Sequence, residues 1–136
     1  MHIARATGFL AEHPRAVLAT ARADGRPQLS PVVAAVDDDG RVLISTRETA
    51  VKARNAARNP QVSLCVLPDA FFGEWVQLDG VAELIHLPDA LPLLEYYYRR
   101  ISGEHPDWDE YRTAMHRDRR LIIRIAVSRA GPDVSG

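Results

Sequence analysis

Apolar residues recur every three to four positions in four stretches of the chain, which is the period of a helix that buries one face. The first stretch ends before Pro14, which disfavours further helix. The second begins at Thr49, whose hydroxyl suits an N-cap, and ends before Pro60. The expected helices span residues 1–13, 49–59, 88–103 and 108–116.

Shorter runs rich in apolar and β-branched residues, separated by turn residues, predict six strands. The Asp24-Gly25 pair favours a tight hairpin between the first two of them. The expected strands span residues 15–22, 27–36, 41–45, 61–67, 74–86 and 121–127. Six mostly antiparallel strands with peripheral helices indicate a closed or split barrel, because closure removes exposed sheet edges.

One proline interrupts the second expected strand. Pro31 cannot donate a ladder hydrogen bond, so this part of the strand should lie at an edge, at a bulge or facing a ligand. The neighbouring residues Gln28, Leu29, Ser30 and Val32 place an amide and a hydroxyl beside that break, where they could meet the polar edge of a flavin-like ring. The alternative is that Gln28 and Ser30 form only the wet face of a half-exposed strand.

Composition and length limit the classes of protein that fit. The 136 residues, 46% of them hydrophobic, form one expected domain, 1–136, and the net charge of -1 argues against a general nucleic-acid binder. Apolar runs stay well short of the roughly 20 residues that span a bilayer, so no membrane partner is expected and the cytoplasm is the default location. The five histidines and Cys65 lack metal-ligand spacing, and no nucleophile motif occurs, so neither a metal site nor a catalytic side chain is assigned.

A possible anion site follows the third expected strand. Hydroxyl groups and cations surround the start of a helix here, and free N–H groups at a helix N-terminus favour a phosphate. The segment runs from Ser45 to Asn55, and its cations Arg47 and Lys52 could converge on a phosphate together with the hydroxyl and N–H donors. An ordinary capped surface helix with a solvated charged face is the alternative, since the glycine spacing of a P-loop is missing.

The long fifth strand offers two further candidates. Trp75 and Gln77 share a face of this strand with Asp79 and Val81, so they could line the pocket of a planar cofactor. Ordinary barrel packing by an aromatic side chain remains the alternative.

The order of motifs resembles the pyridoxamine 5'-phosphate oxidase-like superfamily of split β-barrel flavoproteins, especially its branch that depends on coenzyme F420. The resemblance runs nearly end to end and rests on residues 17–20, 24–30, 52–55, 59–60, 103–111 and 118–120. The segment Gly-Glu-His-Pro-Asp-Trp-Asp at residues 103–109 is particularly similar to the deazaflavin-using members. The resemblance implies a mainly β fold with peripheral α-helices, a six-stranded split β-barrel of the FMN-binding type.

The resemblance also implies a homodimer with two cofactor sites, each built from both chains at the interface. Lys52 is then the best phosphate ligand, Ser45, Thr46, Arg47, Val51 and Asn55 contact the ribityl-phosphate region, and Gln28 to Val32 run beside the ring. Trp75 and Gln77 are weaker assignments, and Arg119 is a candidate from the partner chain or else a surface cation. Ala50 departs from the pattern, because some relatives carry a second basic phosphate ligand there, and Arg47 could compensate.

The expected function is that of an F420-dependent oxidoreductase, which transfers a hydride between reduced deazaflavin and a small conjugated organic acceptor. One alternative is an FMN-dependent oxidoreductase of the same fold, since both cofactors present a ribityl phosphate. A groove lined by cations such as Arg54 and Arg58 would favour F420 and its oligoglutamate tail, whereas a closed pocket would favour FMN. The other alternative is a non-catalytic cofactor-binding protein.

Overall fold

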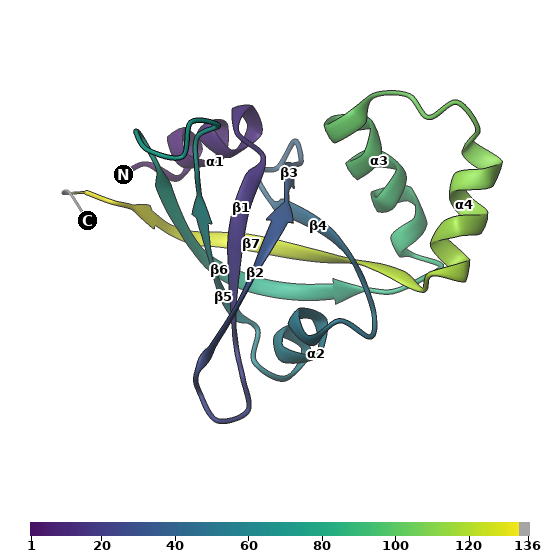
Figure 1. Cartoon of the computed structure of the whole chain (residues 1–136), viewed down its shortest axis with the longest axis horizontal. Coiled ribbons are helices and arrows are strands. Elements are labelled where there is room, and N and C mark those ends of the chain that lie inside the picture. The colour runs from purple at the N-terminus through teal and green to yellow at the C-terminus, as the bar shows by residue number, and fades with distance from the viewer. Residues whose placement is uncertain (134–136) are drawn as a thin grey trace.

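Seven antiparallel strands form one curled sheet in the computed structural model, which describes residues 1–133 (Figure 1). The order across the sheet is β2-β1-β5-β6-β7-β4-β3. The strands are β1 (Arg15–Ala21), β2 (Pro27–Val33), β3 (Ala35–Val36), β4 (Val42–Arg47), β5 (Gln61–Val66), β6 (Val76–Ile85) and β7 (Arg120–Gly131). The two ends of this order, β2 and β3, follow each other directly in the chain. Ala34 joins these two edge strands, but they form no ladder with each other in the described sheet. The sheet is thus curled into a half-barrel, which confirms the split-barrel prediction.

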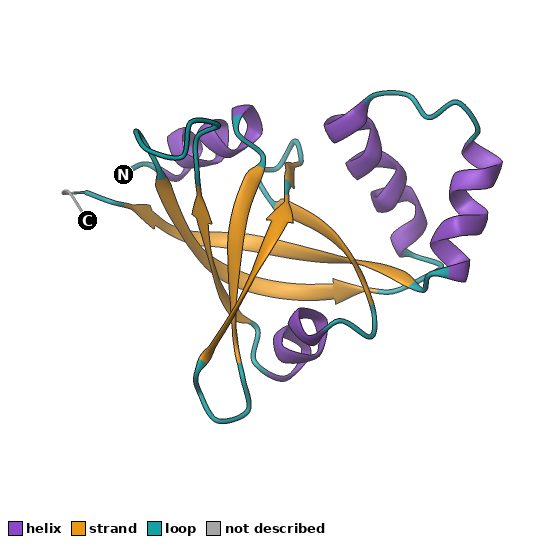
Figure 2. Ribbon diagram, viewed as in Figure 1, coloured by secondary structure: helices purple, strands orange, loops and turns teal. Residues whose placement is uncertain are grey.

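The helices lie around the barrel rather than between its strands (Figure 2). They are α1 (Ile3–Glu12), α2 (Val51–Arg58), α3 (Ala90–Ser102) and α4 (Trp108–Arg117). Helix α1 packs on β3, β6 and β7, whereas α2 packs on β1 and β6. Helices α3 and α4 stand together on one side, over β4 and β7 (Figure 1). Within residues 1–133, no helix is long and apolar enough to cross a membrane.

Two hydrophobic clusters follow from the alternation of side chains along the strands. Inward positions such as Leu18, Ile44 and Ile123 fill the barrel, where each is at most 1% exposed. Outward positions of β4 and β7, among them Leu43 and Ile122, pack against α3 and α4 in a second cluster. The α3–α4 pair is thus fixed to the outside of the barrel by its own small core.

The prediction of six strands is wrong, because the expected strand 27–36 is two strands. At Ala34 the chain leaves the neighbourhood of β1 and crosses to pair with β4 as β3. Ala34 is fully buried, and its N–H donates to the carbonyl oxygen of Pro14 at 2.8 Å. The edge position predicted for Pro31 is confirmed, since β2 pairs with β1 alone in the described sheet.

The predicted N-cap of α2 is also wrong. Ala50, not Thr49, occupies the cap position, with φ -65° and ψ 143°, and no side chain caps the helix. The loop from β4 places Thr49 in the preceding turn, where Ala50 donates its N–H to the carbonyl oxygen of Arg47. The first turn of α2 consequently keeps free backbone N–H groups.

Candidate cofactor-binding site

The N-terminus of α2 offers the features of an anion site. The carbonyl oxygen of Ala50 accepts hydrogen bonds from the N–H groups of Ala53 and Arg54. Within residues 1–133, no hydrogen bond uses the N–H groups of Val51 and Lys52. A side chain at the cap would have satisfied one of these donors. The missing cap leaves them available, together with the positive end of the helix dipole, for a negatively charged group.

Positive charge is concentrated around this turn although the whole chain carries a net charge of -1. Residues 47–58 contain four cations, Arg47, Lys52, Arg54 and Arg58, against one anion, Glu48. Lys52 is half-buried and forms no ion pair with any residue that the structure describes. A lysine held against the protein without a counter-ion is suited to a ligand phosphate.

The strand before α2 presents its candidates on alternate faces. Thr46 points into the barrel and is 5% exposed, whereas Ser45 and Arg47 point outward. Arg47 approaches Asp118 at 3.9 Å and remains largely exposed. The side chains of Ser45 and Thr46 therefore do not converge on one point, because successive residues of a strand face opposite sides.

Polar side chains connect α2 with the candidate residues of β2. Asn55 donates from Nδ2 to the Thr20 hydroxyl at 3.2 Å, and that hydroxyl donates to Oε1 of Gln28 at 3.1 Å. Arg58 donates to Oδ1 of Asn55 at 2.9 Å and to the carbonyl oxygen of Ala21 at 2.7 Å. The structure thus brings Gln28 and Asn55, predicted separately, into one network.

Thr20 was missing from the predicted site, and Arg58 was predicted only as a cation that could line a groove for the oligoglutamate tail. The sequence held one signal for Thr20, because the Asp24-Gly25 hairpin sets a register that places Thr20 opposite Gln28. The link from Arg58 to the end of β1 joins residues 37 apart in the chain, so no local pattern indicated it.

Strand β2 divides its candidates between two faces. Leu29 and Pro31 lie on the outer face, where Leu29 is 62% exposed. Gln28, Ser30 and Val32 lie on the inner face, and the Ser30 hydroxyl is buried without a hydrogen-bond partner. A buried hydroxyl without a partner is rare in folded proteins. This orphaned group fits a ligand with polar edges lying along β2.

Trp75 and Gln77 lie far from α2 within one chain. Ala82 of β6 donates its N–H to Pro60, just beyond α2, whereas Trp75 precedes Val76 at the other end of the same strand. Seven residues of strand separate the two points by about 23 Å. Trp75 and Gln77 instead border a cavity of about 260 Å³ near Gly131 and Pro132.

Gln77 belongs to a polar cluster around Asp79. Its amide donates to Oδ1 of Asp79 at 3.0 Å, the Ser63 hydroxyl donates to the same oxygen at 2.6 Å, and Arg129 pairs with Oδ2 at 3.0 Å. The hydrogen bond from Ser63, with those from Gln77 and Arg129, lowers the pKa of the Asp79 carboxyl. This ionised cluster borders an open groove of about 660 Å³ across β1, β5, β6 and β7.

Arg119 lies between α4 and β7 on an exposed turn. Its φ is 51°, and its guanidinium approaches Glu48 at 3.6 Å while its carbonyl oxygen accepts the N–H of Glu48. Arg119 is therefore an exposed cation beside the β4–α2 loop of its own chain.

The curled antiparallel sheet with its short basic helix defines a split-barrel protein. Residues 4–131 match the family model of pyridoxamine 5'-phosphate oxidase, so the chain belongs to that family. Members of this family bind flavin-like cofactors, and the superfamily includes oxidoreductases.

Solved structures share the fold over most of this chain. A conserved hypothetical protein from Mycobacterium tuberculosis is 26% identical with a TM-score of 0.77, and the match covers 100% of this chain and 92% of that one. An F420 reductase is 25% identical with a TM-score of 0.67, covering 90% and 93% of the two chains. A heme storage protein from Vibrio cholerae, 19% identical with a TM-score of 0.69 and 96% and 94% coverage, shows the breadth of function that this fold serves.

Proposed function

We propose that this protein is an F420-dependent oxidoreductase that transfers a hydride between reduced deazaflavin and a small conjugated organic acceptor. The observation that carries the proposal is the uncapped N-terminus of α2, with the unpaired Lys52 in its first turn. Two free N–H groups and an ammonium group together match the phosphate that F420 and FMN share.

Two observations favour F420 over FMN. The F420 reductase among the solved structures matches 90% of this chain at 25% identity. Arg54 of α2 is exposed and forms no ion pair among residues 1–133, so it is available to the carboxylates of an oligoglutamate tail. Arg58 is also exposed, although two of its hydrogen bonds are internal.

The residues of this chain would bind and orient the cofactor. The bound deazaflavin supplies the hydride. Lys52 and the first turn of α2 hold the phosphate, while Gln28 and the Ser30 hydroxyl offer polar groups along β2. Orientation of the two reactants accounts for the catalysis, because holding them at reacting distance lowers the barrier without a dedicated acid or base.

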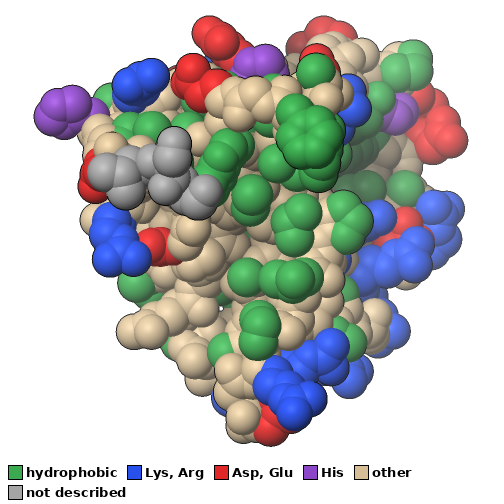
Figure 3. Space-filling view, turned by 60° about the vertical axis from the view of Figure 1, so that its left-hand side comes forward, with side chains coloured by type: hydrophobic (Ala, Val, Ile, Leu, Met, Phe, Trp, Pro, Cys, Tyr) green, Lys and Arg blue, Asp and Glu red, His purple; other side chains and the backbone are tan. Residues whose placement is uncertain are grey.

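The exposed outer face of the sheet supports a homodimer. Large apolar side chains are exposed here, including Leu29 of β2 at 62% and Val81 of β6 at 50%; Phe72 of the β5–β6 loop is also exposed, at 84%. Figure 3 shows hydrophobic side chains gathered across the middle of one face with charged groups at its rim. A second copy of the chain would cover both this face and the unpaired edge of β2.

The dimer also explains the position of Trp75. Because Trp75 and Lys52 lie at opposite ends of one barrel, a single cofactor could contact both only if Trp75 comes from the partner subunit. We propose that Trp75 and Gln77 complete the cofactor site of the other chain.

Fluorescence titrations of the cofactor-free protein with F420, FMN and riboflavin test the proposal. We expect F420 to bind most tightly and riboflavin, which lacks the phosphate, most weakly. If FMN binds more tightly than F420, FMN is the cofactor. If F420 binds but no tested acceptor is reduced, the result favours a non-catalytic cofactor-binding protein.

The variant Lys52→Ala tests the phosphate ligand. Loss of a charged hydrogen bond to phosphate should weaken F420 and FMN by about 1.5–3 kcal/mol, roughly ten-fold to 150-fold, with little effect on riboflavin. Arg5→Ala removes one exposed cation from α1 and is the matched control. Equal affinities of the Lys52→Ala and wild-type proteins for FMN would refute the assignment.

A further inference from the structure

A further cavity lies outside the barrel, between the α3–α4 pair and the outer face of β4 and β7. It has a volume of about 330 Å³ and is lined chiefly by Ser45, Tyr97, Tyr98, His105, Tyr111 and Arg120. We call it the tyrosine pocket. Its walls are aromatic rings, and none of its lining side chains is a carboxylate.

Arg120 is the unusual residue of the tyrosine pocket. It is half-buried, its Nε is buried without a hydrogen-bond partner, and it forms no ion pair with any residue in 1–133. The neighbouring Arg47 and Arg119 do have acidic partners, at 3.9 and 3.6 Å. Partly buried guanidinium groups are normally paired, because removing an unpaired charge from water is unfavourable.

The other polar groups of the pocket add donors. The Asp107 N–H donates to Nδ1 of His105 at 2.9 Å, so the neutral imidazole carries its proton on Nε2. Neither this nitrogen nor the Ser45 hydroxyl has a hydrogen-bond partner in the described part of the chain. Burial raises the pKa of Tyr111 to about 12, with Arg120 opposing the shift in part, so its phenol remains protonated at neutral pH.

The aromatic walls can accept a flat ligand. Tyr98 lies 5.0 Å from the His105 ring and 5.1 Å from the Tyr111 ring, measured between centroids. Tyr111 is fixed by donation from its hydroxyl to the carbonyl oxygen of Leu94, and Tyr97 by donation to that of Val33 at the end of β2. Tilted and edge-on rings of this kind favour planar conjugated molecules.

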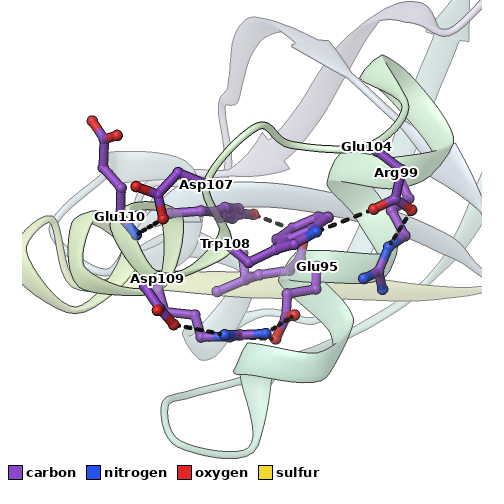
Figure 4. A network of polar contacts seen from close by, with 10 residues as sticks. Glu95, Arg99, Glu104, Asp107, Trp108, Asp109 and Glu110 are labelled. Atoms are coloured by element: carbon purple, nitrogen blue, oxygen red, sulfur yellow. Dashed lines mark hydrogen bonds and ion pairs between the residues drawn. The ribbon is translucent and has the colours of Figure 1, made fainter.

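A network of charged groups holds the α3–α4 connection over the pocket (Figure 4). Glu104 accepts from Nε of Arg99 at 3.0 Å and from Nε1 of Trp108 at 3.1 Å, and the Arg99 guanidinium lies 4.3 Å from the Trp108 ring. Asp107 caps α4 by accepting the N–H of Glu110. The pocket is therefore preorganised rather than formed by a loose loop.

We propose that the tyrosine pocket binds the acceptor, a planar conjugated molecule with a carboxylate that pairs with Arg120. The identification of this ligand as the hydride acceptor rests on the proposed function, whereas the carboxylate site at Arg120 does not. Ser45 lies near the end of β4, which leads to α2, and Tyr97 bonds to Val33 at the end of β2. The pocket is therefore adjacent to β2 and to the strand that precedes α2.

The test compares trans-cinnamate with its neutral analogue trans-cinnamamide on the cofactor-free protein. Calorimetry should give tighter binding of cinnamate by at least about ten-fold, and the imidazole NMR signals of His105 should shift on binding. Arg120→Met should abolish the preference, while Arg117→Met, which removes an exposed arginine paired with Asp118, should retain it. Equal affinities of the two probes for the wild-type protein would overturn the proposal.

Two further measurements separate this proposal from its alternatives. The thermal midpoint of ligand-free Arg120→Met should equal or exceed that of the wild type, because an unpaired charge has been removed. A lower midpoint would assign Arg120 a structural role and overturn the proposal. Cinnamate should also bind in the presence of saturating F420, whereas competition would assign the pocket to the carboxylates of the cofactor tail. Failure of F420 to bind at all would refute the proposed function and leave the probe comparison intact.

Discussion

Replacement of Thr20 by valine isolates the network that joins α2 to β2. Thr20 is 2% exposed, and its single hydroxyl accepts from Asn55 at 3.2 Å and donates to Gln28 at 3.1 Å. Valine keeps the shape and the β-branch, so it suits the strand and leaves no cavity. The substitution therefore removes the two hydrogen bonds and little else.

The magnitude follows from the burial of the two partners. Asn55 is 5% exposed, so its amide N–H loses its partner in a place that water does not readily reach, which costs about 1–3 kcal/mol. Gln28 is only half-buried and can form a hydrogen bond to water instead, so the loss of its bond to Thr20 costs about 0.5 kcal/mol. We expect the free energy of unfolding to fall by about 2 kcal/mol. The affinity for FMN should fall as well, because Gln28 and Asn55 lose their fixed positions.

Urea unfolding at one fixed protein concentration measures the change, since association of chains would make stability depend on concentration. Thr113→Val is the matched control, because Thr113 is exposed on α4 and its hydroxyl bonds only to the carbonyl oxygen of Asp109. The control should stay within about 0.5 kcal/mol of the wild type. A Thr20→Val protein as stable as the control would refute the reasoning.

Three further predictions follow from the sheet. Gly80→Ala places a Cβ 2.5 Å from the carbonyl oxygen of Ala126, so the free energy of unfolding in urea should fall by about 2–4 kcal/mol. Gly8→Ala, on the exposed side of α1, is the control and should raise the free energy of unfolding by about 0.5–1 kcal/mol. The lowered pKa of Asp79 means that its ionised form contributes stability above about pH 4, and this contribution is lost as the pH falls through the folded pKa. Asp79→Asn should therefore be less stable than the wild type by about 1 kcal/mol at pH 7, and this difference should disappear as the pH falls through the lowered pKa of Asp79; a difference constant with pH would contradict the assignment. Leu29→Glu should convert a dimer to monomers in light scattering, and an unchanged mass would remove Leu29 from the interface.

Local patterns were sufficient for most elements of the fold. Helical and alternating periods located all four described helices, and the Asp24-Gly25 pair identified the first hairpin. The alternation along β6 put Gln77 and Val81 on one face, as predicted. These features depend on neighbours a few positions apart, and such neighbours are visible in one sequence.

Two errors had non-local causes. The chain bends at Ala34 because that residue bonds to Pro14 and because β3 finds a partner in β4, contacts that involve residues distant in sequence. Thr49 has the side chain of an N-cap, but the loop leaving β4 places it one residue before the cap position, which Ala50 occupies.

The features of the candidate site likewise divide into those visible in the sequence and those that depend on tertiary packing. By itself the sequence determined the split-barrel fold and the concentration of cations between residues 47 and 58, because both follow from residue types and their local order. Only the tertiary structure decided that Asn55 meets Gln28 through Thr20, that Ser45 and Thr46 face opposite sides, and that Arg120 lacks an acidic partner. Each of these depends on which distant strands and helices pack together, and packing is a property of the whole chain rather than of any segment.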